Sequence, residues 1–391
     1  MIPLMKNAFI YEQETKKALA NFILSSNRLS MDINCFDFEV QFSMKQGRKE
    51  GILFNSGGSA NLAMIQSLKN IGKLKNGDKV GFSALTWATN TMPIIQMGLI
   101  PVPIDCEVET LNIMSSNLED RIKEENLSAL FLTNALGFVG DIEKIIETCK
   151  NHNILLFEDN CESLGTITQT GIKTGNFGIA ASFSFFVAHH ISTIEGGMIC
   201  TDDEELAEML RIVRANGWDR NLTAIQQSKW RKTYNITNEF DAKYIFYDLG
   251  FNFRPTEITG FLGLFQLQFL EETINKRETN YLIIEPFIKN NIDLIFLRHN
   301  HIKILSTFAI PIVCKTPELR TKYLNQFSGA GIEIRPLISG NIQRQPFYSK
   351  YIKKKYPLPN TDFLHDNSFY CGNYPELSNS DIEVIKSCII N

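Results

Sequence analysis

Apolar runs alternate with amphipathic stretches along the first half of the chain. The apolar runs predict strands at positions 51–54, 79–83, 102–104, 129–133 and 154–158. Apolar residues spaced three or four positions apart predict helices between these strands, at positions 60–68, 90–96, 117–123 and 142–149. Strands separated by helices indicate an α/β protein in which a mostly parallel sheet lies between layers of helices.

The second half extends this pattern and then changes it. Positions 181–186 and 198–201 predict two more strands, which bring the expected sheet to seven, and Asp202 or Asp203 caps a predicted helix at 204–215. A long helical stretch at 257–287 is expected to cross from one domain to the next. Strand signals at 302–314 and 331–335, with a helix at 317–327, then indicate a smaller α/β unit. We therefore predict a large domain over residues 1–270 and a small C-terminal domain over residues 271–391.

The net charge and the cysteine spacing limit the kinds of molecule that this protein is expected to bind. The 391 residues include 39 basic and 43 acidic side chains, which gives a net charge of −4 and no general attraction to nucleic acid or an anionic membrane. No run reaches the ~18 apolar residues of a membrane span. The amino terminus lacks a secretory pattern, so we expect a cytoplasmic protein without nucleic-acid or membrane partners. The eight cysteines lack the close spacings of zinc and iron–sulfur sites, so we expect no metal.

A turn with two adjacent glycines joins the first predicted strand to the first predicted helix. Gly57 and Gly58 allow a ligand to approach the backbone closely, and the N–H groups that begin the helix favour an anion. The turn is therefore a candidate phosphate site. A plain strand-to-helix turn would have the same composition, so the motif alone leaves both interpretations open.

An acidic segment follows the strand predicted at 154–158. Asp159 and Glu162 lie where ligands bind in open parallel sheets, at the carboxyl end of a strand. An acid at this position can pair with a protonated ring nitrogen of a cofactor, or it can simply cap a turn.

A third segment, positions 182–197, contains Ser184, His189, His190 and the pair Gly196-Gly197. Together the three segments resemble the fold type I sugar aminotransferases of the DegT/DnrJ/EryC1/StrS family, which act on nucleotide-linked 4-keto-6-deoxysugars. Further matching stretches lie at 214–221, 250–255 and 330–336, so the resemblance covers nearly the whole chain. It implies the fold type I aminotransferase fold.

The resemblance also implies a cofactor, pyridoxal 5'-phosphate or pyridoxamine 5'-phosphate. Trp87 would stack on its ring, Asp159 would bind the ring nitrogen, and Asn252 would reach the phosphate from a neighbouring subunit of a homodimer with shared active sites. The implied cofactor residues are Gly57, Gly58, Trp87, Asp159, Glu162, Ser184 and Asn252. The implied sugar-binding residues are His190, Asn216, Arg220 and Arg254.

The family carries a Schiff-base lysine where this chain has His189. No lysine occurs between Lys173 and Lys229, so a shifted lysine is not at hand. An imidazole cannot hold the cofactor covalently, but it moves protons at neutral pH. A subset of the family with the same histidine consists of 3-dehydratases, which implies removal of the 3-hydroxyl from a nucleotide-linked 4-keto-6-deoxyhexose, with the GDP-linked sugar favoured and L-glutamate restoring the pyridoxamine form.

Two departures and two alternatives accompany this prediction. Asn216 replaces a histidine of the GDP-sugar enzymes and Ala188 replaces a common serine, so the sugar is less defined than the reaction. Relatives that use CDP-linked sugars hold an iron–sulfur cluster with closely spaced cysteines, and positions 221–247 contain none. An aminotransferase with an unusual base and a non-catalytic binding protein on the same scaffold are the alternatives.

Overall fold

A seven-stranded sheet forms the centre of the structure, a computed structural model that describes residues 1–390. Its order is β1-β8-β7-β5-β4-β2-β3, and only β8 runs antiparallel to its neighbours. The strands are β1 (Glu50–Phe54), β2 (Lys79–Ser83), β3 (Ile100–Ile104), β4 (Ala129–Thr133), β5 (Leu155–Asp159), β7 (Ala180–Ser184) and β8 (Gly197–Thr201). The predicted mostly parallel sheet of seven strands is confirmed.

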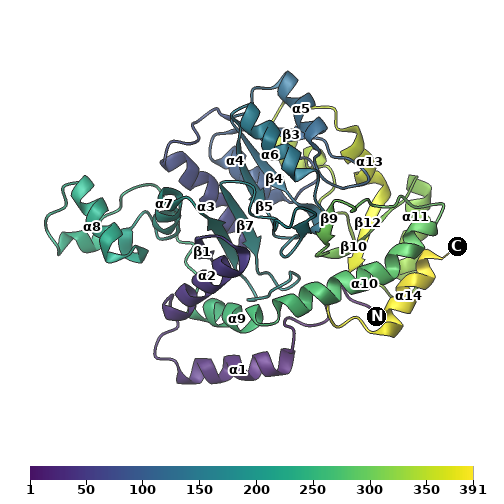
Figure 1. The fold of residues 1–391 in the computed structure, drawn as a ribbon, viewed down its shortest axis with the longest axis horizontal. Coiled ribbons are helices and arrows are strands. Elements are labelled where there is room, and N and C mark those ends of the chain that lie inside the picture. Colours follow the sequence, from purple (N-terminus) through teal and green to yellow (C-terminus); the bar gives the residue numbers. More distant parts are fainter. Residues whose placement is uncertain (391) are drawn as a thin grey trace.

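Helices cover both faces of this sheet (Figure 1). Successive residues of a strand point to opposite faces, so Ile52 and Phe54 of β1 join one apolar core while Leu53 joins another. The first core holds α3 (Gly57–Asn70), α4 (Ala88–Gln96) and α7 (Glu204–Arg214). The opposite face packs against α2 (Ile33–Gln46), α5 (Ser115–Glu124) and α6 (Ile142–Asn151). Asp203 caps α7 by accepting a hydrogen bond from Leu206 N at 3.0 Å, as one of the two predicted caps.

The predicted long helix at 257–287 is wrong in one respect, because the structure divides it. Helix α9 (Glu257–Leu267) is separated from α10 (Leu270–Asn290) by two residues. At the break the N–H of Phe269 donates to Gln266 O, three residues back rather than four, and the Phe269 ring packs edge-on against Tyr11 at 4.8 Å. The N-terminal helix α1 (Glu12–Ser25), which begins directly after Tyr11, lies beside α9 in Figure 1.

A second, antiparallel sheet lies in the C-terminal part, with order β10-β12-β11. It consists of β10 (Ala309–Val313), β11 (Ile334–Pro336) and β12 (Ser368–Gly372), and α11 (Pro317–Gly329) and α14 (Asn379–Ile389) pack on it. The strand signals predicted at 302–314 divide between β10 and β9 (Ile302–Ile304), which instead pairs with β6 (Ile167–Thr168). The smaller α/β unit is therefore present, with α12 (Pro346–Tyr351) and α13 (Pro359–Asn367) as additional helices.

Helix α10 belongs to both parts of the molecule. Its first turns place Leu270 and Ile274 against the core beneath the large sheet, and its last turns place Ile284 and Ile288 in the core of the small sheet. The division of the chain at residue 270 stays a prediction.

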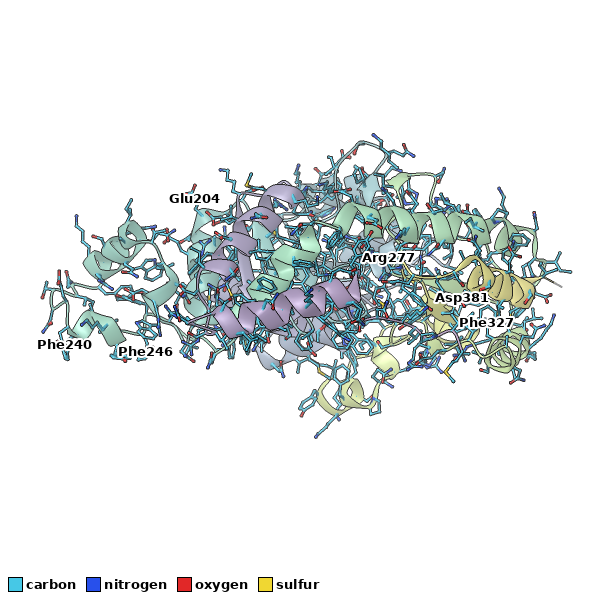
Figure 2. The ribbon with its side chains drawn as sticks, turned by 90° about the horizontal axis from the view of Figure 1, so that it is seen from below. Glu204, Phe240, Phe246, Arg277, Phe327 and Asp381 are labelled. Atoms are coloured by element: carbon cyan, nitrogen blue, oxygen red, sulfur yellow. The ribbon has the colours of Figure 1, made fainter. Side chains whose placement is uncertain are left out.

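An arm projects from the large sheet after α7 (Figure 1). It contains α8 (Ala224–Thr233). Phe240 lies at its far end and Phe246 lies nearer the body of the molecule (Figure 2), with 76% and 58% of their surface exposed. Over residues 1–390, no helix combines the length and the apolarity that crossing a membrane requires.

Candidate active site

The candidate residues gather where the parallel strands end. Strands β1, β2, β5 and β7 run in the same direction, so Phe54, Ser83, Asp159 and Ser184 all lie at one edge of the sheet. Strand β8 runs the opposite way and begins at this edge, where Gly197 pairs with both Phe54 and Ser184. The chain segments that carry the three predicted motifs therefore meet.

The glycine turn brings the start of α3 so close to Ser184 and Gly197 that no added side chain fits there, and we call this turn the cradle. Ser56 caps α3 by accepting a hydrogen bond from Ser59 N at 3.0 Å, which leaves the first N–H groups of the helix at the edge of the sheet. A Cβ atom on Gly57 would lie 2.8 Å from the Cβ of Ser184 and 3.0 Å from its hydroxyl oxygen. A Cβ on Gly197 would lie 2.6 Å from the backbone nitrogen of Gly57. Both positions therefore need glycine, and the N–H groups at the start of α3 are suited to a phosphate.

Asp159 is a buried acceptor in the middle of the edge. Its Oδ2 accepts hydrogen bonds from the amides of Asn61 at 2.9 Å and Asn90 at 2.7 Å, and its Oδ1 accepts one from Cys161 N at 2.9 Å. The neighbouring Glu158 points to the other face, where it binds three backbone N–H groups of residues 175–178. Alternation along β5 therefore gives Asp159, and not Glu158, to the site.

Sequence reasoning missed the two asparagines that hold Asp159. Asn61 was within the glycine motif but had no assigned role, and Asn90 lies one turn into α4. Both carbonyl oxygens, Asn61 Oδ1 and Asn90 Oδ1, are buried without a partner among the described residues. Only the fold reveals this role, since these residues lie 98 and 69 positions from Asp159.

Trp87 lies at the start of α4 with 57% of its surface exposed, while Leu85 and Thr86 just before it are buried. A large flat side chain is thus presented from a fixed backbone. This placement fits the predicted stacking on an aromatic ring.

His189 lies in a turn between β7 and β8. Its N–H donates to Phe186 O at 2.9 Å, its ring packs against Phe308 with 5.1 Å between centroids, and its Nδ1 is buried without a partner among residues 1–390. Burial lowers the pKa of His189 to about 4, although the Cys161 backbone and the Asp159 carboxylate act against this shift. The imidazole is therefore neutral at pH 7 and able to accept a proton.

Arg277 of α10 supports the turn that carries His189, and sequence reasoning missed it. The guanidinium donates to Phe308 O at 2.7 Å and makes longer contacts of 3.4 Å with the carbonyl oxygens of Ala188 and His189. Figure 2 shows Arg277 in the body of the molecule, and burial lowers its pKa to about 10. Its charge also contributes to lowering the pKa of His189.

The adjacent histidine has a different environment. His190 is buried, its Nε2 lies 3.3 Å from Ser306 O, and burial holds its pKa well below the ordinary value. These contacts fit a ring that fixes the turn on the neighbouring 305–308 segment. Its predicted contact with the sugar stays a prediction.

Glu162, three residues after Asp159, has a carboxyl group whose pKa lies near neutral pH. Its Oε2 accepts a hydrogen bond from Leu136 N at 2.9 Å. Burial raises the pKa of Glu162 to about 7, and the charge of Asp159 acts in the same direction. The group can therefore accept or donate a hydrogen bond at neutral pH.

The remaining predicted residues lie around a segment that contacts the start of the glycine turn, where Phe253 O accepts a hydrogen bond from Asn55 N at 3.0 Å. Asn252, Arg254 and Arg220 line a surface cleft of about 450 Å³, and the Nε of Arg254 donates to Asn252 Oδ1 at 3.2 Å. Asn216 is exposed nearby, where it takes a left-handed backbone with φ of 63° and donates its N–H to Phe251 O. The family resemblance predicted that Asn252 reaches the cofactor phosphate of a neighbouring subunit, and this stays a prediction.

Among residues 1–390, no group of three or more His, Cys, Asp or Glu side chains is arranged to hold a metal ion. The cradle at Gly57, the acceptor Asp159 and the exposed Trp87 have the chemistry for a phosphate, a ring nitrogen and a ring face. The residues present thus fit a pyridoxal-type cofactor.

Comparison with known proteins places this geometry in a family. Residues 11–389 match the DegT/DnrJ/EryC1/StrS aminotransferase family. The GDP-4-keto-6-deoxy-D-mannose 3-dehydratase of Yersinia pseudotuberculosis is 32% identical over 364 residues, which cover 90% of this chain and 89% of the relative. The dTDP-4-dehydro-2,6-dideoxy-D-glucose 3-dehydratase of Saccharopolyspora spinosa is 29% identical over 99% of this chain and 86% of its own length.

A solved structure agrees with these sequence matches. The E. coli GDP-4-keto-6-deoxy-D-mannose-3-dehydratase with bound hydrated pyridoxal phosphate superposes with a TM-score of 0.90 at 29% identity, covering 100% of this chain and 99% of that one. The predicted fold type I aminotransferase fold is confirmed.

Proposed function

We propose that this chain, which belongs to the DegT/DnrJ/EryC1/StrS aminotransferase family, is a pyridoxal phosphate-dependent sugar 3-dehydratase. Its substrate would be a nucleotide-linked 4-keto-6-deoxyhexose, with GDP-4-keto-6-deoxymannose favoured because the 32% identical relatives are named for it. The product would be the 4-keto-3,6-dideoxysugar.

One observation carries this proposal: an imidazole occupies the turn after β7 while the rest of the cofactor site is intact. His189 lies within this turn, and the cradle at Gly57 and the acceptor Asp159 lie at the same edge. A side chain that cannot anchor the cofactor covalently, in a site otherwise built for it, favours proton transfer over amino-group exchange.

The bound cofactor would supply an amine that condenses with the 4-keto group and a conjugated ring that accepts electrons. Asp159 would hold the ring nitrogen, and the α3 N–H groups with Ser184 would hold the phosphate. Trp87 would cover one face of the ring. Each role matches a group described at this edge of the sheet.

His189 would move both protons. A pKa of about 4 keeps it unprotonated at neutral pH, so it can take a proton from the cofactor methylene carbon. The imidazolium formed in this step would protonate the departing 3-hydroxyl. Overall the sugar loses one oxygen atom, and glutamate is oxidised to 2-oxoglutarate with release of ammonia, which balances the two-electron reduction.

The direct test incubates the protein with pyridoxal phosphate, L-glutamate and GDP-4-keto-6-deoxymannose, with the CDP- and dTDP-linked sugars in parallel. We expect loss of one oxygen from the sugar, with equal amounts of ammonia and 2-oxoglutarate. His189→Asn should retain the cofactor but react about 10²- to 10⁴-fold more slowly, as loss of an acid–base group does. An amino sugar as product would instead identify an aminotransferase, and binding without turnover of any of these sugars would indicate a non-catalytic protein.

We also propose a homodimer in which Asn252 reaches the cofactor phosphate of the other subunit. Helix α2 presents a stripe of exposed apolar side chains, Ile33, Phe36, Val40 and Met44, opposite the side that packs on the sheet. Apolar stripes of this kind mark interfaces.

Mixing subunits tests the shared site. His189→Asn and Asn252→Ala proteins should each be nearly inactive, whereas a hybrid dimer has one site with both residues intact. Subunit exchange should therefore restore up to about a quarter of wild-type activity, by random pairing. A mixture as inactive as its components would contradict sharing.

We further propose a cytoplasmic location, which the eight free cysteines support because reducing compartments keep thiols free.

A further inference from the structure

The loop that carries Trp87 is held by a segment more than 250 residues away. Ile342 N donates to Ala84 O at 3.1 Å, Asn341 bridges to Leu85, and the Ser339 hydroxyl donates to Thr86 O. The neighbouring strand β3 contributes one more contact, because Ala84 N donates to Ile104 O at 3.0 Å. Every residue between β2 and Trp87 thus has a fixed backbone.

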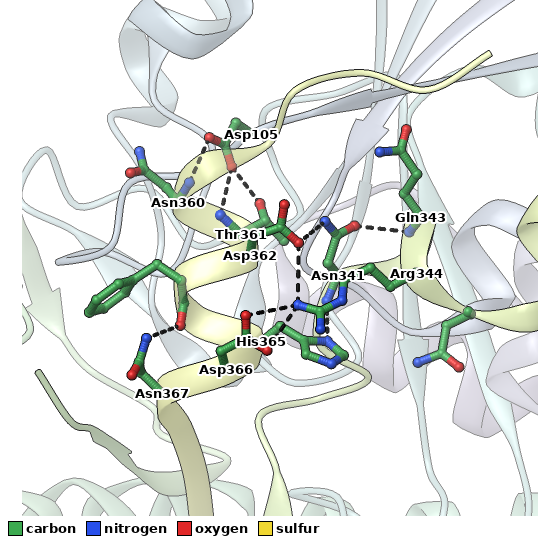
Figure 3. Close-up of polar contacts among 12 residues, drawn as sticks. Asp105, Asn341, Gln343, Arg344, Asn360, Thr361, Asp362, His365, Asp366 and Asn367 are labelled. Atoms are coloured by element: carbon green, nitrogen blue, oxygen red, sulfur yellow. Dashed lines mark hydrogen bonds and ion pairs between the residues drawn. The ribbon is translucent and has the colours of Figure 1, made fainter. Parts of the chain in front are cut away.

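Asn341 is the centre of this holding segment. It is 1% exposed, and each of its polar groups has a partner. Its N–H donates to His365 Nδ1 at 3.1 Å, its side-chain amide donates to Asp362 Oδ1 at 2.9 Å, and its Oδ1 accepts from Gln343 N at 2.9 Å. Figure 3 shows these contacts converging on Asn341.

His365 approaches the backbone so closely that only glycine fits before Asn341. A Cβ on Gly340, whose φ is +63°, would lie 2.1 Å from His365 Nδ1. Because Nδ1 accepts a hydrogen bond, the ring must be neutral with its proton on Nε2. The fold therefore places a specific tautomer beside Asn341.

Helix α13, which carries His365 and Asp362, is itself fixed to the large sheet. Asp105, the residue after β3, accepts hydrogen bonds from Asn360 N at 3.0 Å and Thr361 N at 2.8 Å (Figure 3). Strand β3 pairs with β2, the strand that leads to Trp87. The contacts thus form a closed ring from β3 through α13 and Asn341 back to the Trp87 loop.

We propose that Asn341, oriented by His365 and Asp362, is a positioning residue that fixes Trp87 for stacking on the cofactor. This inference rests on the proposed function for the identity of the stacked ring. It assigns the C-terminal part of the chain a role in cofactor binding without contact with the cofactor.

The ring of contacts is sensitive to pH through His365. Arg344, Asp362, Asp366 and Arg320 are the charged groups around it, and burial followed by the Arg344 charge lowers the pKa of His365 below its usual value. Protonation would convert the Nδ1 acceptor into a donor facing Asn341 N. The neutral form stabilises the fold above the unfolded pKa of about 6.5, and this contribution is lost as the pH falls through the lower folded pKa.

The test uses Trp87 as its own reporter. The chain has three tryptophans, so Trp218→Phe with Trp230→Phe leaves Trp87 alone. In this background, without cofactor, we expect His365→Leu to increase acrylamide quenching of Trp87, whereas His365→Asn should not, because the Asn carbonyl can replace Nδ1 as acceptor. Control variant His301→Leu, which removes a histidine bonded to Val139 O at 2.8 Å elsewhere, should leave the quenching unchanged.

Cofactor affinity completes the test. His365→Leu should weaken binding of pyridoxamine phosphate about tenfold, which is the effect of one buried hydrogen bond. His365→Asn should bind the cofactor as tightly as the wild type. The wild type should lose affinity at acid pH, where His365 is protonated, and His365→Asn should not. Unchanged quenching or unchanged affinity in His365→Leu would overturn the proposal. If the wild-type protein bound no cofactor, the proposed function would fail, while quenching of Trp87 would still decide whether His365 holds the loop.

Discussion

At the scale of single residues, the surroundings of each titratable group in the site determine its protonation state. Burial gives His189 a pKa of about 4 and Glu162 a pKa of about 7, so one is a free base and the other is partly protonated at neutral pH. Cys161, between Gly57 and Asp159, is kept as a thiol because burial and the Asp159 charge raise its pKa. Each of these states follows from position in the fold rather than from residue type.

Replacing His189 by lysine should restore the covalent link that the family's lysine provides. We expect His189→Lys to develop a visible absorption band with pyridoxal phosphate and to lose 3-deoxygenation, because the amine is consumed in the bond. Borohydride reduction followed by peptide mass analysis would locate the adduct. Deoxygenation at the wild-type rate in this variant would show that His189 is not the essential base.

Glu162 should make the stability of the cofactor-free protein depend on pH. A raised folded pKa means that its contribution is full below the unfolded pKa of about 4.5 and is lost as the pH rises through about 7. Relative to Glu162→Gln, the wild-type protein should lose on the order of 2 kcal/mol of unfolding free energy between pH 5 and pH 8, allowing for partial exposure. Urea unfolding across this range measures the difference, and parallel curves for the two proteins would contradict the assignment.

At the scale of elements, the sequence predicted those strands and helices whose apolar residues form a regular local pattern. The strands β2 and β4 were predicted with their observed limits, because buried apolar runs bounded by turns are visible in sequence. Helix α2 was not predicted, since it has apolar residues on both sides: Phe38 and Phe42 face the core, and Val40 and Met44 face outward. Two apolar faces remove the periodic contrast on which such a prediction depends.

The start of α3 should be sensitive to any added side chain. Gly57→Ala would bring a methyl group to 2.8 Å from Ser184 Cβ, and we expect cofactor binding to weaken by roughly 1–3 kcal/mol, as overpacking usually does. Gly329→Ala, at the end of α11 where nothing lies within 4 Å of the new methyl group, should bind cofactor normally. Fluorescence titration compares the two, and equal affinities would contradict the cradle.

At the scale of the whole molecule, residues distant in sequence determine what local patterns cannot. Asn90, Arg277 and Asn341 each act through a partner that the chain brings close only after folding, so motif reading found none of them. Motifs did place Gly57, Asp159 and His189 together, because each follows a strand of the same parallel sheet. The cleft at Asn252 lay beyond such reasoning except by family resemblance.

A buried ion pair joins the two faces of the large sheet. Arg214 of α7 donates to Glu39 of α2 and to Leu53 O at 2.7 Å, while Glu39 accepts from Leu53 N at 2.8 Å. Arg214→Met would leave Glu39 charged and unpaired, and we expect the unfolding free energy to fall by about 3–5 kcal/mol. Adding Glu39→Gln, which still accepts from Leu53 N, should recover part of this loss. Additive effects in urea unfolding would contradict a coupled pair.

The single reversed strand of the large sheet has a consequence for how new activities arise. Because β8 runs against its neighbours, the segment between β7 and β8 leaves and re-enters the sheet at the same edge, and Phe185 N closes it by donating to Gly196 O at 2.9 Å. A loop anchored at both ends keeps its course when one of its side chains is exchanged. We therefore expect substitutions at position 189 to change the chemistry of the site while the loop around it keeps its backbone.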